Sequence, residues 1–296
     1  MLYNVTVDID DLIKGSIDMH VHHSPAAGTT RFDPFELADQ AYKAGMKGMV
    51  LKDTGYPNAA IAALIRKRIP DFEIMGSLCL NYSCGGLNHH AVESSARLGA
   101  RVLWMPTTSS ANSVIKMREL GVPIIDEGIS IIDEKGRLSP RMEQILPVVK
   151  KYGMTLATGH ISPAETFALV DEALKLGIRK LFITHPLDTE FSDKVLSMKE
   201  IKQLAGLGAF IEHTLVCHLP TEFCRDPART VEAIREIGVQ HSIISTDLGL
   251  FAFNPMPVEG FRLFVATLLR NGITPEEIET MAKINPRKLL GLDDSP

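Results

Sequence analysis

The chain of 296 residues is 45% hydrophobic and 23% charged, close to the average of a globular protein, so it can bury a large core. Its formal net charge is only -5, and no basic run appears, which argues against a nucleic-acid partner. We find no signal peptide and no apolar run of about 18 residues, so we expect no membrane partner and a cytoplasmic location. The four cysteines form no C-x-x-C pair and are expected to be reduced thiols.

Eight short apolar runs alternate with longer segments of helical period, a pattern typical of βαβ units around a parallel sheet. The predicted strands are 15–20, 45–52, 72–80, 101–106, 154–160, 180–185, 208–213 and 241–247. We therefore predict an α/β fold, a (β/α)8 TIM barrel, as a single domain over residues 1–296. A flavodoxin-like open sheet is the alternative, although such a sheet normally has fewer strands.

Several segments between the strands carry helix-start signals. Asp33 precedes a proline, and 162–165 and 274–277 both fit the capping box, in which two side chains satisfy free N–H groups at a helix start. Residues 121–138 depart from the alternation of strands and helices, because short apolar runs flank a turn at 133–136. We predict a small hairpin-like insertion there, between strands four and five.

Side chains able to bind metal recur where the predicted strands end. In a (β/α)8 barrel the carboxyl ends of the strands form the active-site face, so these side chains are expected to converge. They are His20, His22, Lys52, His160, His185, His213 and Asp247.

His20 and His22 are two residues apart at the end of the first strand. Because strand side chains alternate between faces, both imidazoles are expected to point the same way and to chelate one ion. Asp18 is expected on that face too, where it would orient one ligand. An isolated H-x-H is often accidental, but ligand-type residues at three later strand ends favour a metal site here.

This arrangement resembles the amidohydrolase superfamily, whose pattern is H-x-H after strand one, His after strands five and six, and Asp after strand eight. The run MAKINPRKLLGL over 281–292 is similar to the helical ending of that superfamily. The resemblance covers nearly the whole chain. Other runs, such as CGGLNHHAVE over 84–93, are typical of an uncharacterised branch rather than of dihydroorotases or phosphotriesterases.

The resemblance implies that His20, His22 and Asp247 bind one metal and that His160 and His185 bind a second. It also implies that Asp247 accepts a proton from the attacking water. The expected cofactor is a divalent metal, first of all Zn²⁺ with Mn²⁺ or Fe²⁺ as alternatives, as one or two ions. The implied enzyme is a hydrolase that uses metal-bound hydroxide to cleave an amide or cyclic amide, a C–N bond other than a peptide bond, or a lactone or ester.

The sequence departs from the familiar two-metal pattern at strand four, which ends in Trp104 and offers no bridging carboxylate or lysine. Lys52, at the end of strand two, is the nearest substitute. We expect it to bridge the metals as a carboxylated lysine, because a free ammonium beside two cations would be disfavoured. The alternative is a Lys52 that pairs with a carboxylate in a one-metal site. Glu127 and Glu212 rank below Lys52 as bridges.

Five further polar residues are candidates for substrate binding: Asn81, Asn88, His213, His218 and Arg225. Arg225 is considered because a guanidinium binds oxyanions in a bidentate manner. A structural role or a solvated loop position is the alternative for each of the five.

Two other functions remain open. One is non-oxidative decarboxylation with a single metal, and the other is a non-catalytic barrel that binds metal and a small molecule. The expected partner is a small-molecule substrate, and a homo-oligomer is also possible. The substrate itself cannot be inferred, because specificity resides in the βα loops.

Overall fold

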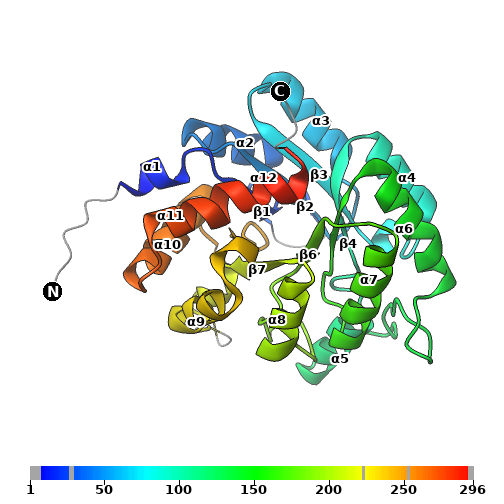
Figure 1. Cartoon of the computed structure of the whole chain (residues 1–296). Helices are drawn as coiled ribbons and strands as arrows, with labels where there is room; N and C mark the ends of the chain where they lie inside the picture. Colours follow the sequence, from blue (N-terminus) through cyan, green and yellow to red (C-terminus); the bar gives the residue numbers. More distant parts are fainter. Residues whose placement is uncertain (1–7, 27–29, 222–223, 252–253, 293–296) are drawn as a thin grey trace.

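The computed structural model describes residues 8–26, 30–221, 224–251 and 254–292. Parallel strands form its centre and helices surround them (Figure 1). The strands are β1 (Ile17–His22), β2 (Gly48–Lys52), β3 (Glu73–Cys79), β4 (Ala100–Trp104), β5 (Thr155–Ala157), β6 (Leu181–Ile183), β7 (Phe210–Thr214) and β8 (Ser242–Ser245).

These eight strands form one sheet in the order β1 to β8, and each is parallel to its neighbour. A parallel bridge between Val21 and Leu248 joins the first strand to the segment after the last. There, Asp247 N donates to His20 O at 2.9 Å and His22 N donates to Leu248 O at 2.8 Å. The (β/α)8 barrel predicted from the sequence is therefore confirmed, and the open flavodoxin-like sheet is excluded.

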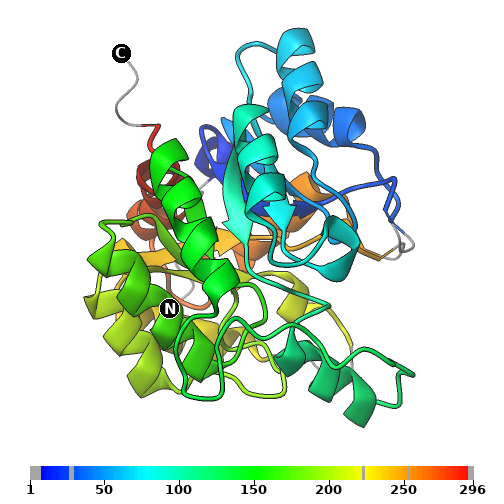
Figure 2. The ribbon, with the colours of Figure 1, turned by 90° about the vertical axis from the view of Figure 1, so that its right-hand side faces the viewer.

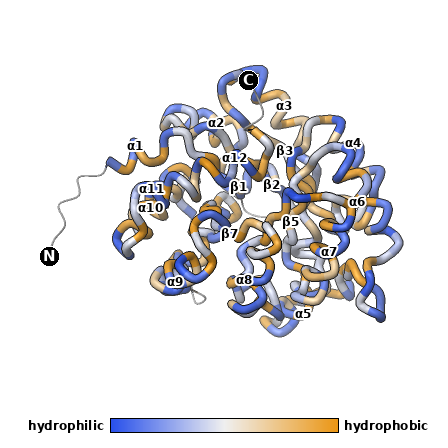
Figure 3. Tube along the Cα trace, viewed as in Figure 1, coloured by the Kyte–Doolittle hydropathy of each residue, from blue (hydrophilic) through white to orange (hydrophobic). Residues whose placement is uncertain are grey.

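Helices follow the strands and pack around them. They are α1 (Ile9–Ile13), α2 (Pro34–Lys43), α3 (Ala59–Arg68), α4 (His89–Arg97), α5 (Ala111–Glu119), α6 (Pro140–Tyr152), α7 (Pro163–Lys175), α8 (Met198–Gly206), α9 (Pro227–Ile237), α10 (Pro257–Arg270), α11 (Pro275–Glu279) and α12 (Asn285–Leu290). Asp33 caps α2, and capping boxes begin α7 and α11, as predicted. Hydrophilic and hydrophobic residues alternate along the helices, so each buries one face against the barrel (Figure 3).

Apolar side chains fill the barrel interior and, separately, the layer between strands and helices. The interior cluster includes Val50, Val102, Trp104, Phe210 and Ile243. The alternate residues of the same strands, such as Leu51 and Ile244, pack outward with the helices. The interior is thus a packed core below the carboxyl ends of the strands, which leaves those ends to carry the site.

A β-bulge interrupts β1 inside the H-x-H segment. Asp18 pairs with Met49 and Val21 pairs with Leu51, so two residues, Met19 and His20, lie opposite one residue of β2. The extra residue changes which side chains face inward. His22 pairs with the inward-facing Lys52, whereas Asp18 falls on the outward face. The prediction that Asp18 shares the face of the two histidines is wrong, because simple alternation does not cross a bulge.

The segment 121–138 forms the predicted hairpin-like insertion. Ile132 and Leu138 make an antiparallel bridge, and Asp133 N donates to Arg137 O at 2.8 Å across the turn. The buried Glu165 of α7 accepts from Ile131 N at 2.9 Å, which fixes the insertion to the barrel. Figure 2 shows α5 and the chain that follows it projecting from one side of the molecule.

Within the described ranges, no helix is long and apolar enough to cross a membrane. All four cysteines are free.

Candidate metal centre

The predicted metal-binding side chains do lie at the carboxyl ends of the strands. His20, His22 and Lys52 end β1 and β2, and all three are almost completely buried. His160 and His185 follow β5 and β6, and Asp247 follows β8; each is less than 10% exposed.

Asp247 occupies the middle of this group. Its Oδ1 lies 2.8 Å from Nε2 of His20 and 3.1 Å from Nε2 of His22. Its Oδ2 lies 3.8 Å from Nε2 of His185. One carboxylate therefore connects the H-x-H pair to the histidine after β6.

Glu212 of β7 binds the ring nitrogen of His20 that does not face Asp247. Nδ1 of His20 donates to Oε1 of Glu212 at 3.0 Å, and Ser245 donates to the same oxygen at 2.5 Å. Oε2 of Glu212 accepts from the main-chain N of His185 at 3.1 Å. Glu212 thus fixes the ring orientation of His20 and leaves Nε2 directed at Asp247, the arrangement in which a carboxylate orients a histidine ligand.

Lys52 enters the same group from β2. Its Nζ lies 2.7 Å from Nε2 of His20 and 4.7 Å from the ring centre of Trp104. The Trp104 ring also lies 4.9 Å from the His20 ring. At its carboxyl end, β4 therefore contributes the bulky Trp104 side chain and no group that could bridge two metal ions.

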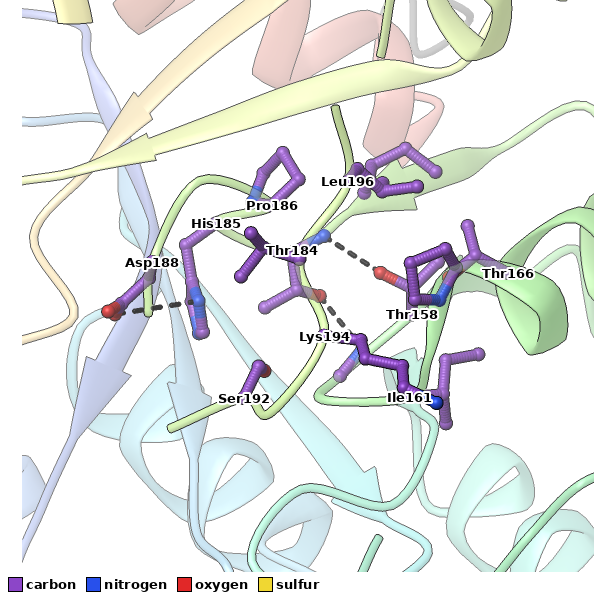
Figure 4. A pocket seen from close by; sticks show the side chains of 14 residues that line it. Thr158, Ile161, Thr166, Thr184, His185, Pro186, Asp188, Ser192, Lys194 and Leu196 are labelled. Atoms are coloured by element: carbon purple, nitrogen blue, oxygen red, sulfur yellow. Dashed lines mark hydrogen bonds and ion pairs between the residues drawn. The ribbon is translucent and has the colours of Figure 1, made fainter. Parts of the chain in front are cut away.

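His160 and His185 form the other half of the site, with ring centres 5.1 Å apart. Ser113 lies 3.4 Å from Nδ1 of His160, and Phe191 stacks on its ring. Figure 4 shows the His185 side chain beside Asp188, whose Oδ2 is 3.8 Å from Nδ1 of His185.

The pKa shifts of three of these groups, His22, His160 and Asp247, suit metal binding. Burial lowers the pKa of His22 to about 4, and burial together with His185 and Lys52 holds the pKa of His160 well below its usual value. Burial disfavours the charged form of Asp247, but His20, His22 and Lys52 outweigh it and hold the pKa of this carboxyl well below its usual range. Neutral imidazoles and an ionised carboxylate are the states that ligate a cation.

The donor set of the described residues fits a divalent metal. Imidazole nitrogens of His20 and His22 and an oxygen of Asp247 lie within 4.8 Å of one another, and so do donor atoms of His20, His185 and Glu212. Nε2 of His185 is buried without a hydrogen-bond partner among the described residues, which is costly unless another group binds it. Imidazole and carboxylate together are ligands that Zn²⁺ and similar ions prefer.

Two backbone features fix the ligands in place. Asp247 has a φ of 53°, the left-handed conformation that is unusual for a residue other than glycine and that recurs at functional sites. Gly159, directly before His160, has a φ of +56°, and a Cβ there would lie 2.4 Å from the carbonyl oxygen of Met105. The chain can turn into His160 this close to β4 only with glycine.

The structure brings His213 and Arg225 to one pocket but leaves Asn81 and Asn88 away from it. Asn81 is buried, and its amide is fully used: Nδ2 donates to Thr54 O and Thr107 Oγ1, and Oδ1 accepts from two main-chain N–H groups. Asn88 caps α4. A substrate role for Asn81 is disfavoured because these loop contacts consume its hydrogen-bonding capacity.

The predicted histidines at the end of β7 and in the loop after it also make structural contacts. His213 pairs with the outward-facing Ile244, and its Nε2 lies 3.3 Å from Ser242 Oγ. Both ring nitrogens of His218 are occupied, by Arg225 O at 2.8 Å and Thr230 Oγ1 at 3.2 Å. A substrate role for His213 or His218 stays a prediction. The contacts that their rings make with other protein groups do not favour it. Arg225 lines a pocket that reaches His185 and Glu212.

Sequence reasoning underrated two residues of the site. Glu212 was ranked only as a minor bridge, yet it holds His20; the signal for it was its place two residues after Phe210, on the inward face of β7. Asp188, three residues after His185, was missed. Glu127 is exposed in the insertion and takes no part in the cluster.

Comparison with solved structures shows the same barrel fold in other proteins. The chain has a TM-score of 0.66 and 14% identity to an amidohydrolase from Pseudomonas aeruginosa, covering 96% of this chain and 98% of that one. The probable dipeptidase PvdM from the same organism gives 0.65 and 14%, covering 96% of each chain. A 2,6-dihydroxybenzoate decarboxylase from Rhizobium gives 0.53 and 13%, covering 95% and 99%. The amidohydrolase resemblance inferred from the motifs is thus confirmed at the level of the fold.

The chain itself belongs to DUF6282, a family of unknown function, whose family model matches residues 15–212. The match includes the H-x-H pair and the histidines after β5 and β6, whereas Asp247 lies beyond it. No curated protein matches the chain.

Proposed function

We propose that this protein is a metal-dependent hydrolase that cleaves an amide or cyclic amide, or a lactone or ester, of a small molecule. The observation that carries the proposal is the position of Asp247, whose Oδ1 lies within 3.1 Å of Nε2 of His20 and His22 and whose Oδ2 lies 3.8 Å from Nε2 of His185. The amidohydrolase fold supports it.

His20, His22 and Asp247 would hold one divalent ion, and His160 and His185 a second. A bound ion of this kind polarises a carbonyl oxygen and lowers the pKa of its bound water to about 7. Asp247 would accept the proton of the attacking water, because its carboxylate is ionised and buried at the junction of the two ligand groups. Glu212 would keep Nε2 of His20 directed at the metal.

Lys52 is proposed to bridge the two ions as its carbamate. In that reaction the uncharged Nζ attacks the carbon of CO₂, an N–C bond forms, and one proton leaves to solvent. The buried position of Nζ beside His20 supports this, since a carbamate carries oxygens toward the ligand group while an ammonium would repel the ions. Trp104 Nε1, buried without a hydrogen-bond partner in the described structure, offers a donor in the same neighbourhood.

A single-metal decarboxylase is the second candidate. The observation that favours it is Trp104 at the end of β4, where no group of that strand can bridge two ions. A 2,6-dihydroxybenzoate decarboxylase also shares the fold. If Lys52 is not carboxylated, one ion held by the H-x-H pair and Asp247 becomes the better description.

The test is turnover by the metal-loaded protein of a panel of amides, cyclic amides, lactones, esters and aromatic carboxylates. Hydrolysis that stops on chelation and returns with Zn²⁺ supports the proposal. Release of CO₂ from a carboxylate, with no hydrolysis of any panel member, would instead support the decarboxylase.

A further inference from the structure

The barrel closes between β1 and β8, which bring His20, His22 and Asp247 to the metal centre. Every other pair of neighbouring strands is joined by a parallel ladder of registered residue pairs. In the part of the chain that the structure describes, β1 and the segment after β8 share only the isolated bridge between Val21 and Leu248. The spacing of the two ligand segments at this junction therefore depends on further contacts.

The side chain of Asp18 supplies such contacts. The residue is 1% exposed, and its Oδ1 accepts from the main-chain N of Thr246 at 3.0 Å and from that of His20 at 3.2 Å. Its Oδ2 accepts from Thr246 Oγ1 at 2.6 Å. One buried carboxyl group thus binds the main chains of both β1 and the segment after β8.

These contacts lie directly beside the proposed ligands. His20 is a ligand itself, and Thr246 immediately precedes Asp247, whose φ of 53° is held only if the surrounding chain is fixed. Thr246 Oγ1 also lies 3.4 Å from His20 O, and Leu248 N donates to this hydroxyl at 3.4 Å. Asp18 and Thr246 together therefore tie the chain on both sides of Asp247 to β1.

The main-chain N of Thr246 is the group that makes this arrangement sensitive. Thr246 is completely buried, and a buried donor that loses its acceptor costs about 1–3 kcal/mol unless the chain moves to find another. Metal ligands must be held to within about 0.5 Å of their working geometry. A small shift of the chain at Thr246 would therefore change the distance from Asp247 Oδ1 to His20 Nε2, now 2.8 Å.

We propose that Asp18 is a positioning residue of the metal centre, which sets the distance between the Asp247 carboxylate and the imidazoles of the H-x-H pair. The inference rests on the proposed function, because it takes these side chains to be the ligands. Asp18 is not a ligand itself, since its two oxygens are used by main-chain N–H groups and the Thr246 hydroxyl.

The test compares Thr246→Val, which keeps the shape of the side chain and removes its hydroxyl, with Thr246→Ser, which keeps the hydroxyl. We expect Thr246→Val and Asp18→Asn each to weaken Zn²⁺ binding by about 10- to 100-fold and Thr246→Ser to bind as the wild type does. In the double variant the two losses should be smaller than their sum, because both changes break one contact. The measurement is competition for Zn²⁺ against a chelator of known affinity.

Thr155→Val is the matched control. Thr155 is 1% exposed, and its Oγ1 donates to Leu289 O at 3.0 Å, at the first residue of β5 and so at the other end of the barrel. We expect it to lower the melting temperature as Thr246→Val does and to leave Zn²⁺ affinity unchanged. The visible absorption of the Co²⁺-loaded protein, which reports ligand geometry, should change in Thr246→Val and not in the control.

Equal Zn²⁺ affinity in Thr246→Val and Thr155→Val would overturn the role of Asp18 and leave the proposed function intact. An equal loss of affinity in Thr246→Ser and Thr246→Val would also overturn it, because the hydroxyl would not be the cause. The predicted affinities in a protein that turns over no member of the substrate panel would overturn the proposed function and support the positioning role. The Thr246 variants decide the matter even where Asp18→Asn fails to fold.

Discussion

Glu212 and His20, 192 residues apart in the sequence, meet inside the barrel with Oε1 3.0 Å from Nδ1. Both side chains are completely shielded from solvent. Burial disfavours the charged form of Glu212, but the His20 ring beside it holds the pKa of the carboxyl below its usual value. This contact sets which nitrogen of His20 faces Asp247, and so it sets the geometry of the proposed ligand group.

Replacing Glu212 with Gln should weaken metal binding by about 10- to 100-fold, because the histidine loses the charged acceptor that orients it and raises its basicity. The measurement is competition for Zn²⁺ against a chelator of known affinity. Glu232→Gln, an exposed change of the same kind on α9, is the control. Equal affinity in the Glu212 variant and the control would show that the carboxylate does not support the site.

Replacing Asp247 with Asn should lower turnover of any substrate found by about 10²- to 10⁴-fold, because the amide cannot accept the proton of the attacking water. Asn suits this position, since it tolerates the left-handed backbone better than other residues do. The measurement is kcat in the variant reconstituted with metal. Activity close to wild type at full metal content would exclude Asp247 as the base.

Removing the metal should lower the melting temperature without unfolding the protein. The barrel has its own packed core, so only the binding contribution is lost, about 2.7 kcal/mol at an ion concentration 100 times Kd. The measurement is thermal unfolding before and after chelation, with Zn²⁺ added back. A melting temperature that changes neither on chelation nor on addition of Zn²⁺ would mean that the folded chain binds no ion.

Gly159→Ala should destabilise the protein by more than the strain of a left-handed alanine alone, because the added Cβ would also clash with a neighbouring carbonyl. Gly153 provides the matched control, since it has a similar φ of +60° but a Cβ at that position would meet nothing within 4 Å. We expect Gly153→Ala to cost about 1–2 kcal/mol of unfolding free energy. Gly159→Ala should cost clearly more and reduce metal content, because its Cβ would meet the Met105 carbonyl directly before His160. Equal costs and full metal content would refute this.

Lys52→Ala should reduce two bound ions to one. Mass spectrometry of the wild type under native conditions should detect a chain heavier by one CO₂, and this increment should be absent from the variant. Lys43→Ala, exposed at the end of α2, is the control and should change neither reading. If the Lys52 variant keeps two ions and full activity, the bridging role is wrong.

The strands and most of the ligand group could be predicted because each depends on local sequence. Apolar runs mark strands that are covered on both faces, and polar residues such as His185 and Asp247 stand out where those runs end. Proline and capping residues identify helix starts for the same local reason.

What could not be predicted depends on contacts between distant segments. The bulge in β1 moves Asp18 outward, and its carboxylate accepts from Thr246 instead of orienting an imidazole. Asn81 resembled a substrate ligand by its place after β3, but contacts with the two loops after β2 and β4 use its whole amide. Glu212 gains its role only when β7 and β1 face each other across the closed barrel.

The metal centre can be tested by anomalous scattering from a crystal of the protein purified without chelators. We expect an ion bound by His20, His22 and Asp247, with a second beside His160 and His185 if Lys52 is carboxylated. Anomalous signal absent from the His20, His22 and Asp247 group, in protein supplied with Zn²⁺, Mn²⁺ and Fe²⁺ in turn, would contradict it.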